Sequence, residues 1–164
     1  MADPEKCKFT FVSNALSRES FSVVNFKGYE GLSRLYDFEI MLVSKQDSLD
    51  LESILASPAF FTIKAEQGDL PYHGILESID QRQKVGEYTF YRVVLRPKLW
   101  WLTQTCHNQI FLNKSLPQFL ESVLKDGGLS KGIDFDLKLS RNYPEWEYVC
   151  QYNESHFDFI SHWL

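Results

Sequence analysis

In the strand-like segments of this sequence, three pairs of carboxylates stand two residues apart, an arrangement that places both acids of a pair on one face of a β-strand. The pairs are Asp37/Glu39, Asp134/Asp136 and Glu145/Glu147. Two carboxylates facing one cleft could serve as acid and base in glycoside hydrolysis if the fold set their separation. The alternative interpretation, that each pair lies on a solvated strand face, is favoured, because catalysis would need a cleft that brings two carboxylates to the right separation.

Other residue types of catalytic sites are present without the spacing that catalysis needs. Ser155, His156 and Asp158 are the residue types of a triad, but close neighbours on a helix point away from one another. The sequence contains no GxSxG, GxxxxGK[ST], HExxH, GxGxxG or EF-hand motif, so no enzyme is predicted. The adjacent Trp100 and Trp101 could stack on a sugar or a base, although a hydrophobic plug is the favoured interpretation.

The four histidines also lack the spacing of a metal site. They are His73, His107, His156 and His162, and the last two are six residues apart on an expected helix, so they face different directions. The sequence therefore predicts that the four histidines do not converge on one metal ion, and it implies no cofactor.

The cysteines suggest neither a disulfide framework nor a CxxC metal site. Cys7, Cys106 and Cys150 are an odd number at wide spacing, with no CxxC pair. We expect them to be reduced and mostly buried, like other small apolar residues.

Composition excludes several classes of partner. The 164 residues are 44% hydrophobic with a formal net charge of -5, and no basic block suggests binding to nucleic acid or to an anionic membrane. The first residues, "MADPEKCKFTF", carry charges where a signal peptide needs an apolar core, and no apolar run is long enough to insert into a membrane. Synthesis in the cytoplasm is therefore expected.

Strand signals dominate the first two thirds of the chain. Short segments rich in β-branched and aromatic residues are separated by turn signals such as "EQGDLP" and "QKVGE". Six or so strands in about a hundred residues favour a small antiparallel barrel over a parallel sheet. We expect a closed or nearly closed β-barrel within residues 1–112, from about Lys8 to Leu112.

The pattern changes in the last fifty residues or so. "SLPQFLESVLKDGG" has a capping Ser, a Gln three residues later, one apolar face and a Gly stop, which predicts a helix from Leu116 to about Asp126. "IDFDLKLS" alternates like a strand, and "EWEYVCQY" is expected to pair with it. Residues 113–164 are therefore predicted to begin a second, α+β domain, which makes the fold mainly β with an α+β part.

The last residues predict an amphipathic helix without a stop signal. Ser155 suits an N-cap and Asp158 the first turn, but no Gly, Asn or Pro follows the last apolar residue. We expect a truncated chain whose terminal helix contacts a missing domain. The expected contact residues are Phe157, Phe159, Trp163 and Leu164.

Several phrases, read in order, resemble the N-terminal region of VgrG proteins, the spikes of type VI secretion systems, which are related to contractile phage tail hubs. The most specific are P-x-LW-x-L at Pro97 to Leu102, IF-x-N-x-S before the expected helix, and Q-Y-x-E-S-x-x-D-F at Gln151 to Phe159. Longer phrases, "NFKGYEGLSRLYDFEIMLVS" and "YVCQYNESHFDFISHWL", extend the resemblance over nearly the whole chain.

The resemblance implies a fragment of the spike hub with a mechanical function. It implies a homotrimer in the full-length protein, contact with the hexameric tube protein, effector or adaptor partners, and export by the secretion apparatus without a signal peptide. A phage or prophage baseplate hub protein is the first alternative, because it is nearly the same physical object. A small-ligand-binding or hydrolytic β-barrel is the second alternative, and a deep pocket with convergent polar groups would support it.

Overall fold

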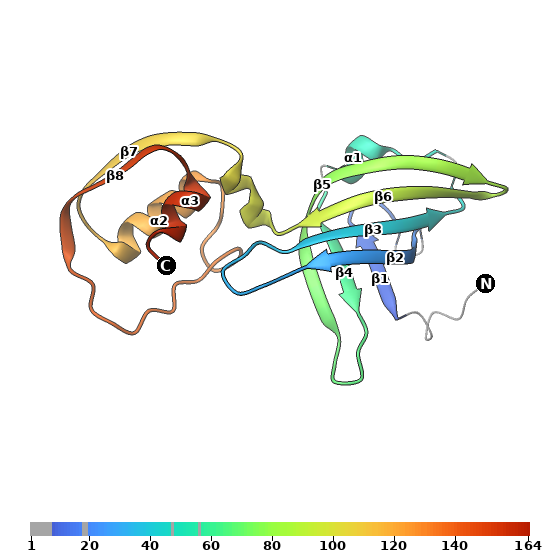
Figure 1. Cartoon of the computed structure of the whole chain (residues 1–164), viewed down its shortest axis with the longest axis horizontal. Helices are drawn as coiled ribbons and strands as arrows, with labels where there is room; N and C mark the ends of the chain where they lie inside the picture. Colours follow the sequence, from blue (N-terminus) through green and yellow to red (C-terminus); the bar gives the residue numbers. More distant parts are fainter. Residues whose placement is uncertain (1–7, 18–19, 47, 56) are drawn as a thin grey trace. The chain divides into compact units, whose positions relative to one another are not determined.

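The chain divides into two compact units, one ending at Pro97 and the other beginning at Lys98 (Figure 1). The structure, a computed structural model, describes residues 8–17, 20–46, 48–55 and 57–164. Cys7 lies outside these residues. Each unit has its own cluster of buried apolar side chains, so each is described by itself.

The first unit is an antiparallel sheet of six strands with one short helix. Its strands follow the order β1-β4-β5-β6-β3-β2. In β5 and β6, Val85 pairs with Tyr88 across a two-residue turn, and Gly86 supplies the positive φ of 60° there. The elements are β1 (Phe9–Ser13), β2 (Ser22–Tyr29), β3 (Asp37–Ser44), α1 (Leu51–Leu55), β4 (Ala59–Ile63), β5 (Leu70–Val85) and β6 (Tyr88–Arg96).

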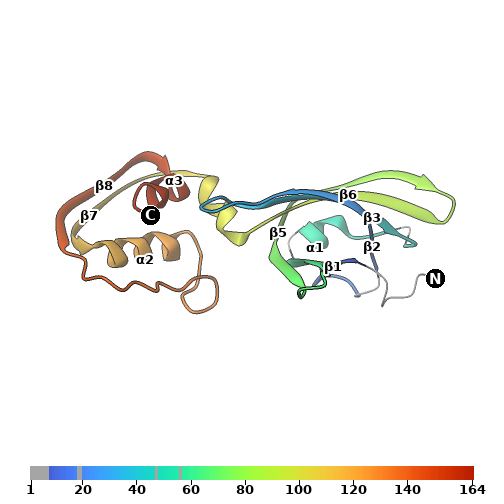
Figure 2. The ribbon, with the colours of Figure 1, turned by 60° about the horizontal axis from the view of Figure 1, so that its bottom comes forward.

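The sheet curls because β5 changes partner along its length. Its first part pairs with β4 up to Gly74, and its remainder pairs with β6 from Ile75 onward. Gly74 is required at this point, because a Cβ there would lie 1.9 Å from the carbonyl oxygen of Arg96. Figure 2 shows the resulting bend in β5.

Aromatic rings from both ends of the strand order meet inside the curled sheet. Phe9 of β1 and Phe26 of β2, on the two edge strands, have ring centroids 4.9 Å apart. Phe26 lies equally close to Phe61 of β4, at 4.9 Å, and Phe38 of β3 lies 5.4 Å from Phe61. The edges therefore approach each other around one core, and the predicted antiparallel barrel is present as a strongly curled sheet.

The second unit is a two-stranded antiparallel ribbon with two helices on its concave side (Figures 1 and 2). The barrel was expected to extend to Leu112, but β7 pairs with β8, so the segment before Leu112 belongs to this unit. The boundary between the two units therefore lies at Pro97, before β7, and not at Leu112. The elements are η2 (Lys98–Thr103), β7 (Cys106–Ser115), α2 (Leu116–Asp126), β8 (Glu145–Ser155) and α3 (His156–Ser161).

Both predicted helices of this unit form with their predicted caps. The amide of Ser115 donates to Gln118 Oε1 at 2.7 Å at the start of α2. In α3 the hydroxyl oxygen of Ser155 accepts from the amide of Asp158 at 3.0 Å.

No helix in the described part of the chain has the length and apolar content to cross a bilayer.

The predicted strand "IDFDLKLS", residues 133–140, does not form. The structure has turns and one isolated bridge, between Lys131 and Phe135, in this region. Ile133 is 86% exposed, so its alternation with Phe135 does not mark a buried face. β8 was expected to pair with this segment but pairs with β7, which leaves residues 133–140 without a neighbouring strand to hydrogen-bond.

Candidate functional site

The outer face of the ribbon is the side of β7 and β8 that points away from α2 and α3. Ile110 pairs across the strands with Cys150, and Leu112 pairs with Tyr148. The exposed fractions on this face are large, at 60% for Ile110, 59% for Leu112, 55% for Tyr148 and 78% for Tyr152. Contiguous exposed apolar surface of this kind is typical of protein contacts.

The inner face of the same strands is buried. Phe111 of β7 and Val149 of β8 belong to the core cluster of the unit, and Gln151 is fully buried. Side chains alternate between the two faces of a strand, so these buried residues alternate in sequence with the exposed residues of the outer face. Apolar residues on both faces indicate strands that are covered on both sides, as in the interior of a larger sheet.

Sequence reasoning missed the outer face, although the signal was present. The run Ile110, Phe111, Leu112 is apolar without alternation, and Tyr148, Cys150 and Tyr152 stand at every second position. The first pattern predicts a strand buried on both faces. The second predicts a row of side chains along one face.

The four residues predicted to contact a missing domain have different environments. Phe159 is 2% exposed and packs in the core, with its ring centroid 5.8 Å from that of Phe111. Trp163 is partly buried against Phe119, at 5.0 Å between centroids, and Phe157 is also partly buried. Leu164 is 84% exposed. Of the four, Leu164 is therefore the most open to another segment, whereas Phe159 is held within this unit.

The residues with the types of a triad do not assemble one. The hydroxyl of Ser155 donates to the Asp158 carboxylate at 2.6 Å and caps α3. The ring of His156 instead hydrogen-bonds Asp126 and Gln151. Ser155 and Asp158 therefore contact each other, contrary to the expectation that close neighbours point apart, whereas His156 takes part in other contacts.

The carboxylate pair on β3 lies in cross-strand ion pairs. Arg92 of β6 donates to Glu39 at 2.6 Å, and Arg96 lies 2.9 Å from Asp37. The hydrogen bond from Arg92 lowers the pKa of Glu39. Both carboxylates are thus bound to cations on a strand surface, as the solvated-face interpretation predicted.

The other two carboxylate pairs differ from the expected pattern in one respect. Asp134 and Asp136 lie outside any strand, and Asp134 pairs with Lys98 at 2.8 Å. Glu145 and Glu147 are exposed at the start of β8. Only the pairs on β3 and β8 therefore lie on strands.

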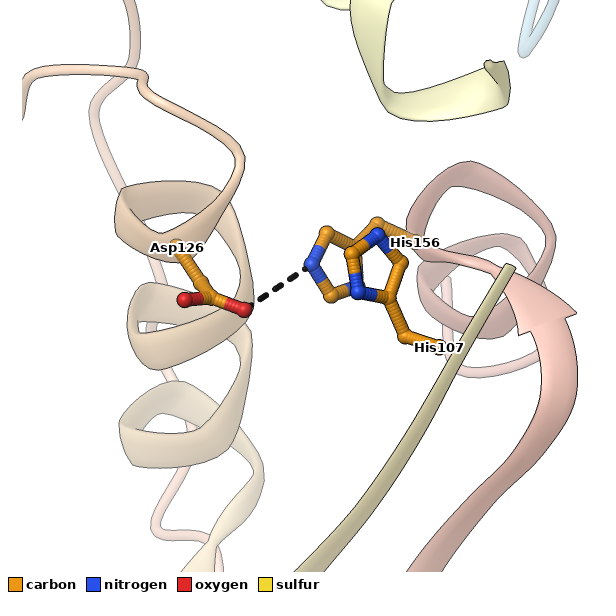
Figure 3. Close-up of side chains that lie close together, drawn as sticks. All are labelled: His107, Asp126 and His156. Atoms are coloured by element: carbon orange, nitrogen blue, oxygen red, sulfur yellow. Dashed lines mark hydrogen bonds and ion pairs between the residues drawn. The ribbon is translucent and has the colours of Figure 1, made fainter. Parts of the chain in front are cut away.

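Two of the four histidines come together beside Asp126 (Figure 3). The rings of His107 and His156 stack with centroids 3.7 Å apart and planes inclined by 7°. His156 Nε2 lies 3.1 Å from Asp126 Oδ2. Burial lowers the pKa of His156 and the neighbouring His107 lowers it further, whereas Asp126 opposes the shift. The sequence spacing did not predict this cluster, because its three residues come from β7, α2 and α3.

The remaining histidines lie in other contacts. His73, in the first unit, stacks on Phe60 with centroids 4.4 Å apart. His162 lies 3.3 Å from the Glu154 carboxylate. The prediction that the four histidines share no ion was based on spacing, and the group in Figure 3 contains neither His73 nor His162.

Two cysteines and the tryptophan pair also have defined surroundings. Cys106 and Cys150 are free and exposed, which corrects the expectation that they are buried. Cys150 is exposed because it lies on the outer face of the ribbon. Trp100 and Trp101 lie in η2 of the second unit, outside the six-stranded sheet, and Trp101 is 52% exposed.

Comparison with known proteins places this chain among tail hub and spike proteins. Residues 29–164 match the family described as phage tail baseplate hub (GPD). The chain is 36% identical over 162 residues to the type VI secretion system spike protein VgrG1b of Pseudomonas aeruginosa, a match that spans 98% of this chain and 22% of that protein. The chain thus spans about a fifth of the length of this curated relative.

Two solved structures show the same fold. The E. coli c3393 protein, a component of the type VI secretion system with structural similarity to the T4 tail proteins gp27 and gp5, matches with a TM-score of 0.82 and 28% identity. That match covers 93% of this chain and 41% of the other. The 43 kDa tail protein of prophage MuSo2 from Shewanella oneidensis matches with a TM-score of 0.59 and 14% identity, covering 94% of this chain and 48% of the other.

Proposed function

The chain belongs to the phage tail baseplate hub (GPD) family, and from this premise we propose that it forms part of the hub of a type VI secretion spike. The role is mechanical: the hub supports the spike and transmits the force that drives it into a target cell. The observation that carries the proposal is the 36% identity to a spike protein over 98% of this chain.

The outer face of the ribbon is the assembly surface of this hub. Its exposed side chains, Ile110, Leu112, Tyr148 and Tyr152, are apolar or aromatic, as in the centre of protein interfaces. A second hub domain, from the same polypeptide or from a neighbouring copy, covers this face in the assembled spike. Leu164, exposed at the end of the described chain, is a further contact of the same kind.

The partners follow from the role of a spike hub. The assembled protein is a homotrimer, it sits on the hexameric tube protein, and it carries effector or adaptor proteins. Function by assembly accords with the sequence, which has no recognised catalytic motif. Export occurs through the apparatus itself and needs no signal peptide.

A phage or prophage baseplate hub is the second candidate. The fold of the MuSo2 tail protein, at a TM-score of 0.59, favours it. The two candidates differ in what the cell loses when the gene is deleted. A secretion spike is needed for release of tube protein into the medium, whereas a phage hub is needed for infectious particles.

The experiment is performed in the bacterium, on the protein as the cell makes it. Deletion of the gene is expected to stop release of tube protein, and the wild-type gene is expected to restore it. A photo-reactive phenylalanine analogue at Tyr148 should cross-link to a hub domain. Peptide mapping of the cross-link then shows whether the contact lies within one polypeptide or between copies.

The matched control carries the same analogue at Tyr29, which is 65% exposed on β2 of the first unit. It is expected to give no cross-link to the segment captured from Tyr148. Loss of phage particles with unchanged release of tube protein would establish the second candidate. Absence of both phenotypes would contradict the hub function.

A further inference from the structure

The cluster of His107, Asp126 and His156 has the composition of a metal site. One possible ligand atom from each residue lies within 4.8 Å of the others. The three come from β7, from the last residue of α2 and from the first residue of α3 (Figure 3). We propose that these side chains bind one divalent transition-metal ion, with Zn²⁺ as the probe.

The ligand types suit this ion. Zn²⁺ is commonly bound by imidazole nitrogens at about 2.0–2.1 Å and carboxylate oxygens at about 2.0–2.2 Å. Two such ligands on a tetrahedral ion lie about 3.3 Å apart, by the geometry of those bond lengths. His156 Nε2 and Asp126 Oδ2 are 3.1 Å apart, so a small outward movement of Asp126 admits the ion. The Asp126 side chain is 50% exposed, which leaves it room to move and leaves the ion a path from solvent.

Each ligand is held by a second polar residue. The side chain of Gln151 is fully buried, and its Oε1 lies 3.2 Å from His156 Nδ1. This contact fixes the His156 ring and leaves Nε2 for the ion. Gln109 donates to the Asp126 carboxylate at 2.6 Å. Supporting hydrogen bonds of this kind orient the ligands of metal sites and raise metal affinity.

His107 completes the set after its ring turns. Thr105 Oγ1 lies 2.8 Å from His107 Nε2 and leaves Nδ1 as its available nitrogen. The ring now stacks on His156, and because ring lone pairs lie in the ring planes, two parallel rings cannot direct them to one ion. His156 is 1% exposed and fixed, so His107, which is only partly buried, is the residue that rotates.

The competing state is a cluster held by a proton. In it, His156 Nε2–H donates to Asp126, and Gln151 donates to the unprotonated Nδ1. The metal-bound and proton-held states differ in whether the protein retains an ion and in whether His107 is needed for that retention.

The test uses the whole chain without a histidine tag, stripped with a chelator and dialysed. Titration with Zn²⁺ by calorimetry is expected to give one tight site per chain. His107→Asn and Asp126→Asn, which change a partly buried and an exposed residue, should each weaken binding at least about tenfold, since loss of even a supporting contact costs about 10–100-fold. Co²⁺ in place of Zn²⁺ should give visible absorption bands that His107→Asn removes.

The matched control is His73→Asn, in the first unit, which is expected to leave Zn²⁺ binding unchanged. Far-UV circular dichroism of each variant shows that the fold is retained. His156 is not substituted, because it is buried and starts α3. The proposal is overturned if the wild-type chain retains no Zn²⁺, which is the result expected of the proton-held cluster. It is equally overturned if His107→Asn and Asp126→Asn bind Zn²⁺ like the wild type.

Discussion

The two units of this chain solve the problem of burying a sheet in different ways. In the first unit the sheet curls until rings from its edge strands meet, and Ile40, Phe61 and Tyr91 become fully buried. In the second unit a ribbon of two strands cannot curl around a core, so α2 and α3 cover one side only. Its other side exposes Leu112 and Tyr148.

This difference indicates which unit buries the apolar face of its own sheet and which leaves one sheet face open to contact. A sheet that curls around its own core buries its apolar face without a partner. A two-stranded ribbon with apolar residues on both faces needs a cover on each. The assembly contacts of the hub are therefore expected on the second unit, at the outer face of the ribbon, and each prediction below tests one side of this contrast.

The largest expected effect on the free energy of unfolding comes from removing a buried aromatic ring from the core of either unit. Phe119→Ala in the second unit and Phe61→Ala in the first each remove a fully buried ring, and each should lower the free energy of unfolding by about 3–5 kcal/mol. All four tryptophans lie in the second unit, at positions 100, 101, 146 and 163. Tryptophan fluorescence during urea unfolding thus reports the second unit, and far-UV circular dichroism reports both.

If the two units are separate, Phe119→Ala shifts the fluorescence transition and Phe61→Ala leaves it in place. A fluorescence midpoint that moves equally in both variants would show that the units unfold together. That result would remove the contrast between a self-sufficient unit and a dependent one.

The outcome of the sequence analysis follows the same division. The strands of the first sheet were predictable because turn signals separate segments rich in β-branched and aromatic residues. Their order was not, because β1 pairs with β4 and β3 with β6, which are far apart in sequence. The helix Leu116–Asp126 was predictable because its cap and its stop are local as well. The pairing of β7 with β8 joins segments far apart in sequence, and "IDFDLKLS" offered a nearer strand that does not form. The histidine cluster depends on that long-range pairing, so spacing could not reveal it.

The next largest effect on stability concerns the ionisation of Tyr36, which packs partly buried against the core of the first unit. Burial raises the pKa of Tyr36 to about 12, and its hydroxyl donates to the carbonyl oxygen of His73. An unfolded tyrosine ionises near pH 10, so the unfolded chain loses this proton first as pH rises. The stabilisation is fully present below about pH 10 and is lost as pH rises towards 12, by about 2 kcal/mol after allowance for partial exposure.

Tyr36→Phe should remove this part of the alkaline destabilisation. The measurement is the free energy of unfolding by circular dichroism at pH 9 and pH 11.5, compared between the wild type and the variant. The control is Tyr88→Phe, because Tyr88 is 40% exposed at the hairpin end of β6. An equal alkaline loss in the wild type and Tyr36→Phe would contradict the assignment to Tyr36.

A smaller effect is expected at the start of α3. Ser155→Ala removes the hydroxyl that accepts from the Asp158 amide, and loss of such a cap costs about 1 kcal/mol. Ser161→Ala makes the same change at the exposed end of the same helix, and we expect a loss below about 0.5 kcal/mol there. Urea unfolding followed by tryptophan fluorescence measures both. Equal losses would show that α3 is held by the packing of Phe159 rather than by its cap.

The smallest effect on stability, and the sharpest test of the contrast, is expected on the outer face of the ribbon. Tyr148→Ser should change the free energy of unfolding by less than about 0.5 kcal/mol, because the side chain is 55% exposed. Val149→Ala, one residue along and facing the core, should cost about 2 kcal/mol.

Sedimentation of the wild-type chain should show concentration-dependent association that Tyr148→Ser weakens, since a contiguous apolar face left open in the isolated chain pairs with the same face of another copy. A wild-type chain that stays monomeric, together with a Tyr148→Ser variant as unstable as Val149→Ala, would mean that Tyr148 is already packed within its own unit and that the ribbon needs no partner.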